Sequence, residues 1–319
     1  MKRFLSLLAT LAVSLSTMAA SYPDKPVRIV VPYSPGGGGD VVGRPLSQEL
    51  GKQLGGSFYI DNRGGAGGIL GTQAVVNAPA DGHTLLFSSV GAIAIAPYLM
   101  SKVPYDPAKD LVPVVRVATA PMVLVTGANS RHQNVAALVA AAKASPGKVS
   151  FASAGPGTTT QLGSELLKRE AGADMVHIPY KGAAPALTDV VAGTVDAMFA
   201  DAPVVLPFVK SGKLRALAIG TPVRSTGLPE VPTTAEAGYK GVLASTWYGL
   251  MAPAKTPPAV VHRLNSALNT ILSSSEAASF FGGQALIING GSPEEFGTFI
   301  GSETKRWTAL ARDAGVKMD

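Results

Sequence analysis

The chain has 319 residues, 46% hydrophobic and 15% charged, which is typical of a folded globular protein large enough for two cores. It contains no cysteine, which excludes disulfide scaffolds, thiolate metal sites and cysteine nucleophiles. The net charge is +6, but no basic block is interleaved with aromatic residues, so nucleic acid is not an expected partner. A mild positive charge of this kind is compatible with a small anionic ligand.

The first 20 residues have the features of a secretory signal peptide. A basic start precedes an uncharged apolar run from Phe4 to Met18, and small residues follow at Ala19 and Ala20. This run is shorter than the roughly 20 apolar residues of a membrane-spanning helix, and no later segment is long and apolar enough to span a bilayer. We therefore expect cleavage near Ala19 or Ala20 and a soluble mature protein in a Gram-negative periplasm.

The first half of the chain alternates short apolar runs with glycine-rich loops. The predicted strands are Val27–Val31, Phe58–Ile60 and Thr84–Phe87. The loops that follow them are Ser34–Gly39, Asp61–Gly68 and Ser88–Ala92, and the first two lead into segments with helical spacing of apolar residues. The pattern indicates strand, loop and helix units.

The second half continues this alternation. The predicted strands are Met122–Thr126, Val149–Ala152, Met175–Ile178, Ala197–Phe199 and Leu214–Ile219. Helices are expected between them and near Ala259–Ser273 and Pro293–Ala314. Repeated units of this kind predict an α/β fold of mostly parallel sheets flanked by helices, with a ligand crevice at the carboxyl ends of the strands.

The glycine loops are candidate anion sites. A loop that opens a helix presents main-chain N–H groups without helical partners, and glycine allows a carboxylate or phosphate to approach them. Ser34–Gly39, Ser88–Ala92 and Ser153–Thr160 contain no charged side chain. The alternative interpretation is that each loop is only a tight turn.

Enzyme functions have weaker support in the sequence. Neither of the first two glycine loops completes the G-x-G-x-x-G pattern of dinucleotide-binding proteins. Ser153 lies between a predicted strand and a helix, as in the nucleophile elbow of hydrolases, and His177 in the next strand is the candidate base. An exported serine hydrolase that uses Ser153 is therefore kept as an alternative. The histidines form no metal-binding pattern, so neither a metal nor a cofactor is expected.

Several motifs together resemble one family. The run from Val31 to Arg44 is similar to the opening motif of the Bug-type receptors, the periplasmic solute-binding proteins of tripartite tricarboxylate transporters. Further similar segments are Asn62–Gly68, Asp81–Leu86, Pro104–Asp110, Ser153–Thr158, His177–Gly182, Gly212–Leu217, Val231–Gly238 and Trp247–Pro253. The resemblance extends over essentially the whole chain after the signal peptide.

This resemblance implies a two-lobed periplasmic-binding-protein fold of type II-like topology, with the ligand in a cleft between the lobes. Lobe 1 is expected to comprise residues 21–120 and 249–319, and lobe 2 residues 121–248, with crossings near Val117–Val123 and Ser245–Leu250. Hinge closure would trap an organic carboxylate for delivery to the membrane subunits of the transporter. We expect a monomer without catalytic activity. A sensor that feeds a signalling partner is a further alternative.

The resemblance also implies that main-chain groups of both lobes hold a ligand carboxylate. The ligand-binding residues expected from lobe 1 are Tyr33, Ser34, Pro35, Gly36, Gly37, Gly39, Ala66, Ser88 and Ser89. Those expected from lobe 2 are Ser153, Ala154, Gly155, Thr158, Thr159, Lys181, Ala183 and Asp201. Arg44 and Lys181 are candidates for a second carboxylate, or solvated charges.

Two departures from the family pattern concern the ligand. Gly64 stands where the family usually has proline, which would loosen that loop. Ala200 stands where the family often has an acidic residue after Phe199, so that residue is either absent or displaced by one position, to Asp201. This favours a plain mono-, di- or tricarboxylate, aliphatic or aromatic, over an amino acid. Asp201 either contacts the ligand or acts as a helix N-cap, and Asp40 is interpreted as the N-cap of its helix.

Overall fold

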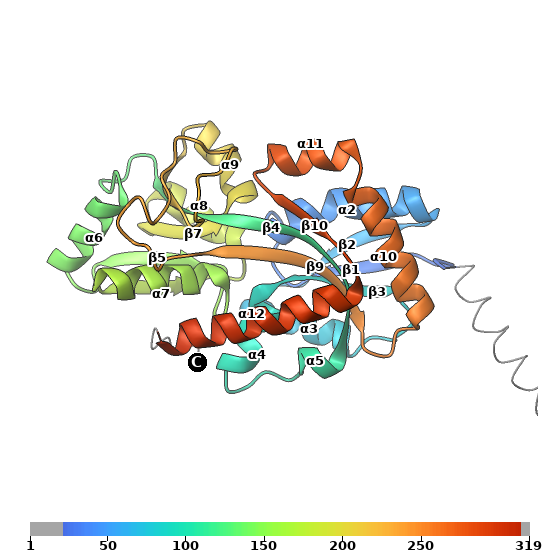
Figure 1. Cartoon of the computed structure of the whole chain (residues 1–319). Helices are drawn as coiled ribbons and strands as arrows, with labels where there is room; N and C mark the ends of the chain where they lie inside the picture. Colours follow the sequence, from blue (N-terminus) through green and yellow to red (C-terminus); the bar gives the residue numbers. More distant parts are fainter. Residues whose placement is uncertain (1–21, 314–319) are drawn as a thin grey trace, which may run out of the picture.

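The computed structural model describes residues 22–313, so the predicted signal peptide lies outside the described residues. One continuous path of strands runs through the molecule in the order β2-β1-β3-β9-β4-β7-β5-β6, with β10 and β8 attached to β4 (Figure 1). We name two parts of the molecule lobe 1 and lobe 2 by the strands that they contain. Lobe 1 contains β1 (Val27–Val31), β2 (Phe58–Asn62), β3 (Thr84–Ser89) and β10 (Ile287–Gly290). Lobe 2 contains β5 (Val149–Ser153), β6 (Met175–Pro179), β7 (Ala197–Asp201) and β8 (Leu214–Ile219). Strand β4 (Leu111–Gly127) runs through both lobes, and β9 (Ser245–Pro253) pairs with β3 and with residues 111–121 of β4.

Helices cover both parts of the sheet. The helices of lobe 1 are α2 (Gly38–Leu54), α3 (Ile69–Val76), α4 (Ala96–Leu99), α5 (Pro107–Asp110), α10 (Pro258–Leu272), α11 (Ser275–Gly283) and α12 (Pro293–Asp313), with the single turns η1 (Ala66–Gly68) and η2 (Gly91–Ile95). The helices of lobe 2 are α6 (Val135–Ala144), α7 (Thr159–Ala171), α8 (Ala183–Ala192) and α9 (Ala202–Lys210). No helix within residues 22–313 has both the length and the apolar character needed to cross a membrane.

Strand β4 joins the two lobes. Its residues 111–121 pair with β9, whereas residues 122–127 pair with β7 and β8. This change of partner lies within the crossing predicted at Val117–Val123. The strand continues without interruption through this change of partner. The predicted boundaries of the two lobes stay a prediction.

The sheets are mixed rather than mostly parallel. Strands β1, β2 and β3 are parallel to one another, as are β5, β6 and β7. Strands β4, β8, β9 and β10 pair antiparallel with their neighbours. The first half of β4 was not predicted from the sequence, because Pro113 lies within it and proline is rare inside strands. The register shifts near Pro113, which accommodates the proline.

Packing against α12 fixes the second crossing strand. Trp247 of β9 is 2% exposed, and its ring meets Phe296 of α12 edge to face, with 5.4 Å between ring centroids. Gly249, two residues further along β9, leaves room for the same phenylalanine, since a Cβ there would lie 2.2 Å from its ring. The C-terminal helix thus packs directly on a strand that links the lobes (Figure 1).

Candidate functional site

A cavity of about 40 Å³ lies between the lobes at the carboxyl ends of their parallel strands. It is lined by Tyr33, Gly37, Gly38, Gly39, Ser89, Ala154, Thr158, Thr159, Thr160, Ala183, Asp201, Thr246 and Tyr248. None of these lining residues is a lysine, arginine or histidine. Its polar groups are main-chain amides, hydroxyl groups and one carboxyl group.

Four helices begin at the cavity. The first residues of α2 line it, as do those of α7, and Ala183 and Asp201 mark the starts of α8 and α9. The first N–H groups of a helix have no partner within the helix, and the helix dipole makes this end positive. Four such ends around one cavity favour an anion bound through the main chain.

Tyrosine and threonine hydroxyl groups form the rest of the wall. The Tyr33 hydroxyl lies 3.2 Å from the Ser89 hydroxyl and donates to the Gly67 carbonyl at 3.3 Å. Burial raises the pKa of Tyr33 to about 12, so the group stays protonated and remains a donor at neutral pH. The Thr159 and Thr246 hydroxyls, which come from α7 and β9, are 2.7 Å apart.

Asp201 is the one charged side chain of the cavity wall. It ends β7 and occupies the N-cap position of α9, but its carboxyl group makes no capping hydrogen bond. Instead, the Tyr248 hydroxyl donates to its Oδ2. Burial raises the pKa of Asp201 to about 6, although the hydroxyls of Tyr248 and Thr246 lower it in part. The carboxyl group is thus held in the cavity wall by β9 and does not cap its own helix.

Main-chain contacts close the cleft at both edges of the cavity. At one edge, a Cβ on Gly67 of lobe 1 would lie 1.9 Å from the Pro156 carbonyl oxygen of lobe 2. At the other edge, the Ser34 N–H of lobe 1 donates to the Lys181 carbonyl of lobe 2 at 3.3 Å. Backbone therefore meets backbone across the cleft at these two places.

The structure divides the expected ligand-binding residues into two groups. Those on the cavity wall are Tyr33, Gly37, Gly39, Ser89, Ala154, Thr158, Thr159, Ala183 and Asp201. Those away from the wall are Ser34, Pro35, Gly36, Ala66, Ser88, Ser153, Gly155 and Lys181. Ser88 is away from it because successive side chains of β3 point to opposite faces, so only one of two adjacent serines faces the cavity.

Thr246 and Tyr248 line the cavity although no prediction of the site included them, whereas Gly38 and Thr160 line it from within the candidate anion loops Ser34–Gly39 and Ser153–Thr160. Thr246 and Tyr248 lie two residues apart on β9 and therefore point to the same face. The alternation of this strand would have predicted the pair, had its passage beside the glycine loops been known. A side chain at Gly38 is excluded in this conformation, because its Cβ would lie 2.0 Å from the Tyr248 hydroxyl.

The basic candidates lie outside the cavity wall. Arg44 donates to Asp40 at 2.9 Å and to Asn62 at 2.9 Å, so its guanidinium is already paired. Burial raises the pKa of Asp40, but the hydrogen bonds from Arg44 and the Gly36 N–H outweigh it, and the net shift is downward. The N-cap of α2 is Gly37, so the interpretation of Asp40 as the N-cap is wrong. Asp40 lies in the first turn and stabilises the loop before the helix by accepting from the Gly36 N–H. The side chain of Lys181 is exposed.

The hydrolase hypothesis meets a mixed result. The Ser153 hydroxyl lies 2.6 Å from His177 Nε2, within the reach of a nucleophile and its base. However, Ser153 is 0% exposed and does not line the cavity. Burial, and then the positive charge of Lys168, lower the pKa of His177 to about 4, which makes it a weak base at neutral pH. Within residues 22–313 no carboxylate forms an ion pair with His177. The geometry favours a structural serine.

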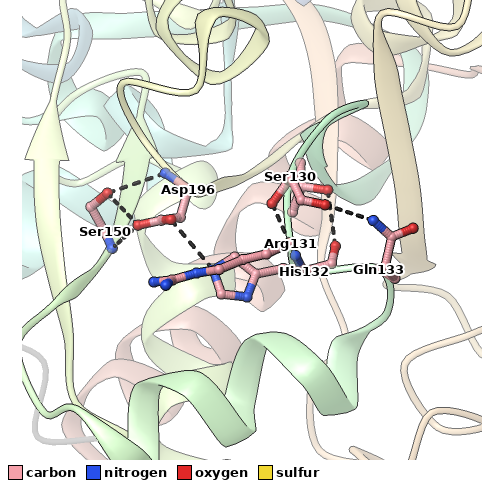
Figure 2. Close-up of polar contacts among 7 residues, drawn as sticks. Ser130, Arg131, His132, Gln133, Ser150 and Asp196 are labelled. Atoms are coloured by element: carbon pink, nitrogen blue, oxygen red, sulfur yellow. Dashed lines mark hydrogen bonds and ion pairs between the residues drawn. The ribbon is translucent and has the colours of Figure 1, made fainter.

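A hydrogen-bonded network around another histidine lies elsewhere in lobe 2 (Figure 2). His132 is 1% exposed, and its Nε2 lies 3.4 Å from Asp196 Oδ1. The other oxygen of Asp196 accepts from the main-chain and side-chain groups of Ser150 at 2.8 and 3.0 Å. This network ties the loop before α6 to β5 and shares no residue with the cavity. Among the described residues, no group of three or more metal-ligating side chains is found.

Comparisons with known proteins agree with this fold. The family model "Tripartite tricarboxylate transporter family receptor" matches residues 42–316. The protein BugT of Bordetella pertussis is 40% identical over 312 residues, which are 98% of this chain and 96% of BugT. Among solved structures, the periplasmic binding protein BugD has a TM-score of 0.88 and 32% identity, over 93% of this chain and 99% of BugD.

Two further similar structures were solved with a carboxylate. Rpa4515 of R. palustris with adipate has a TM-score of 0.89 and 32% identity, over 92% of this chain and 98% of that protein. MatC of Rhodopseudomonas palustris with bound malate has a TM-score of 0.87 and 30% identity, over 91% of this chain and 99% of that protein. With the family match over most of the chain, these similarities show that the chain belongs to the tripartite tricarboxylate transporter family receptors, which are periplasmic solute-binding proteins.

Proposed function

We propose that this protein captures an organic carboxylate between its two lobes and delivers it to the membrane subunits of a tripartite transporter. The observation that carries the proposal is the convergence of four helix N-termini on a cavity whose wall contains no cationic side chain. Main-chain N–H groups at helix ends bind anions of many shapes. Because these helix N-termini come from both lobes, closure of the lobes would bring all of their N–H groups to the ligand.

The main chain can supply enough binding energy for this role. A hydrogen bond to a charged group contributes roughly 1.5 to 3 kcal/mol, so three or four of them reach about 8 kcal/mol, which corresponds to a micromolar dissociation constant. The donors at the starts of α2 and α7 come from different lobes, so the full set exists only when the cleft is closed. Affinity and closure are thereby coupled.

The expected ligand is a plain mono-, di- or tricarboxylate. Adipate and malate, which the two R. palustris proteins bind, support this class. The Oδ2 of Asp201 is occupied by the Tyr248 hydroxyl, so that oxygen is less available to a ligand ammonium group. Export to the periplasm, a monomeric state and the absence of catalysis belong to the same proposal.

A thermal-shift screen of the protein from residue 21 onward tests the proposal. The panel pairs each acid with its amide: malate, adipate, citrate and benzoate against their amides, with aspartate as the amino acid. We expect stabilisation by at least one carboxylate and none by its amide, because only the ionised group gains from the helix N-termini. Hydrolysis of p-nitrophenyl acetate is followed in parallel. Stabilisation by amides alone, or ester turnover without any stabilisation, would contradict the proposal.

A further inference from the structure

A hydrogen-bonded contact crosses the mouth of the cleft away from the cavity. The Ser34 hydroxyl donates to the Lys181 carbonyl oxygen at 2.9 Å, and the Ser34 N–H donates to the same oxygen at 3.3 Å. The two residues are 147 positions apart, in loops that follow β1 of lobe 1 and β6 of lobe 2. Neither residue lines the cavity.

Glycines on both sides make room for this contact. A Cβ on Gly64 would lie 2.9 Å from the Lys181 carbonyl oxygen and 3.0 Å from the Ser34 nitrogen. A Cβ on Gly182 would lie 3.0 Å from the Ser34 nitrogen. Gly64 does not have a positive φ, so its role here is to leave space and not to relieve backbone strain.

We propose that Ser34, with Gly64 beside it, is a latch that sets the affinity of the receptor without touching the ligand. The inference rests on the proposed function, because a latch matters only if the cleft closes on a ligand. The partners belong to different lobes, which are joined through β4 and β9, so the bonds to the Lys181 carbonyl form on closure and break on opening. Ser34 is then a positioning residue for the closed state.

The latch should act on the release of ligand. The apparent dissociation constant depends on the fraction of the protein that is in the closed, binding-competent state. A bond present only in the closed state slows opening, while the approach of ligand to the open cleft is unaffected. Loss of the latch therefore raises the dissociation rate constant and leaves the association rate constant unchanged.

The chain provides closely matched variants. Ser34→Ala removes the hydroxyl donor, and Gly64→Ala inserts one methyl group between the two loops. Lys181→Ala removes the exposed side chain but keeps the carbonyl acceptor, and it controls for the charge of that residue. Gly283→Ala adds a methyl group where no atom lies within 4 Å, and it controls for a glycine substitution as such.

The test is stopped-flow binding of malate or adipate, whichever stabilises the wild type more, together with thermal unfolding in the absence of ligand. We expect Ser34→Ala to raise the dissociation rate constant about three- to tenfold, as for the loss of one hydrogen bond. Gly64→Ala should raise it by at least about tenfold, because the methyl group forces the two loops apart. Both variants should unfold near the wild-type temperature without ligand, and both controls should release ligand at the wild-type rate.

Two results separate the failure of the latch from the failure of the proposed function. Wild-type dissociation rates in both Ser34→Ala and Gly64→Ala, in a receptor that binds carboxylates, would overturn the latch alone. The absence of binding by the wild type to any carboxylate would overturn both. An equal rise in the dissociation rate constant for Lys181→Ala and Ser34→Ala would also overturn the latch, because Lys181→Ala keeps the main-chain carbonyl that accepts the hydrogen bond.

Discussion

The wall of the proposed anion cavity contains one carboxyl group, that of Asp201, and no lysine, arginine or histidine side chain. Burial raises its pKa from 3.8 to about 6, so in the closed protein it binds its proton more tightly than in the unfolded chain. For an acid with a raised pKa, stability is greatest below its ordinary pKa and falls as the pH rises towards the folded value. The stability that protonated Asp201 contributes is lost between about pH 4 and pH 6, because the two pKa values are 3.8 and about 6.

The same group should make binding depend on pH. An ionised Asp201 opposes the closing of the cleft around an anion, so the affinity for a plain carboxylate should fall about tenfold or more between pH 5 and pH 7.5. Asp201→Asn should show a much flatter profile, and calorimetry at a series of pH values measures both. A wild-type affinity that rises with pH for a carboxylate that stays fully ionised over this range would contradict this account.

Ser153 tests the distinction between a receptor and a hydrolase. Ser153→Ala removes the partner of His177 Nε2, and we expect a loss of about 1 kcal/mol in the free energy of unfolding, as for one buried hydrogen bond. Ligand affinity should stay within about twofold of the wild type, since the hydroxyl is off the cavity wall. Urea unfolding and calorimetry measure the two quantities. An esterase activity present in the wild type and absent from this variant would support the hydrolase instead.

At the scale of elements, the first turn of α2 lies directly against Tyr248 of β9 and Asp201 at the end of β7. A Cβ on Gly38 would lie 2.0 Å from the Tyr248 hydroxyl and 2.6 Å from Asp201 Oδ2. Gly38→Ala should therefore weaken ligand binding by at least about tenfold and also lower the free energy of unfolding, because Tyr248 pairs with β3 in the same lobe as α2 and stays beside Gly38 when the lobes separate. Gly301→Ala in α12, where no atom lies within 4 Å, is the matched helical control. Wild-type affinity in Gly38→Ala would show that the start of α2 does not approach the bound ligand.

The elements also show how far the sequence can predict the site. Glycine-rich loops after β-branched runs predicted the starts of α2 and α7, because turn chemistry and apolar spacing are local. Thr246 and Tyr248 could not be predicted, since their place in the wall depends on β9 pairing with β3 and β4, which are distant in sequence. Ser34 was expected at the ligand, but the approach of the loop after β6 gives it a different partner.

At the scale of the whole molecule, β4 and β9 are the connections on which lobe closure depends. Both strands are buried and hydrogen-bonded along their length, so opening requires bending near the place where β4 changes partners. Saturation with a carboxylate should lower the radius of gyration measured by small-angle X-ray scattering. The matching amide, as the control, should leave it unchanged. An unchanged radius with saturating ligand would show that binding does not involve closure.

The most direct test of the account is a crystal structure of the protein with the carboxylate that stabilises it most. We predict that the ligand carboxylate lies in the cavity, with its oxygens within hydrogen-bond distance of main-chain N–H groups at the starts of α2 and α7. The Ser34 hydroxyl should meet the Lys181 carbonyl in that structure, as it does here. A carboxylate paired instead with a lysine or arginine side chain, or bound outside the cleft, would contradict the central claim.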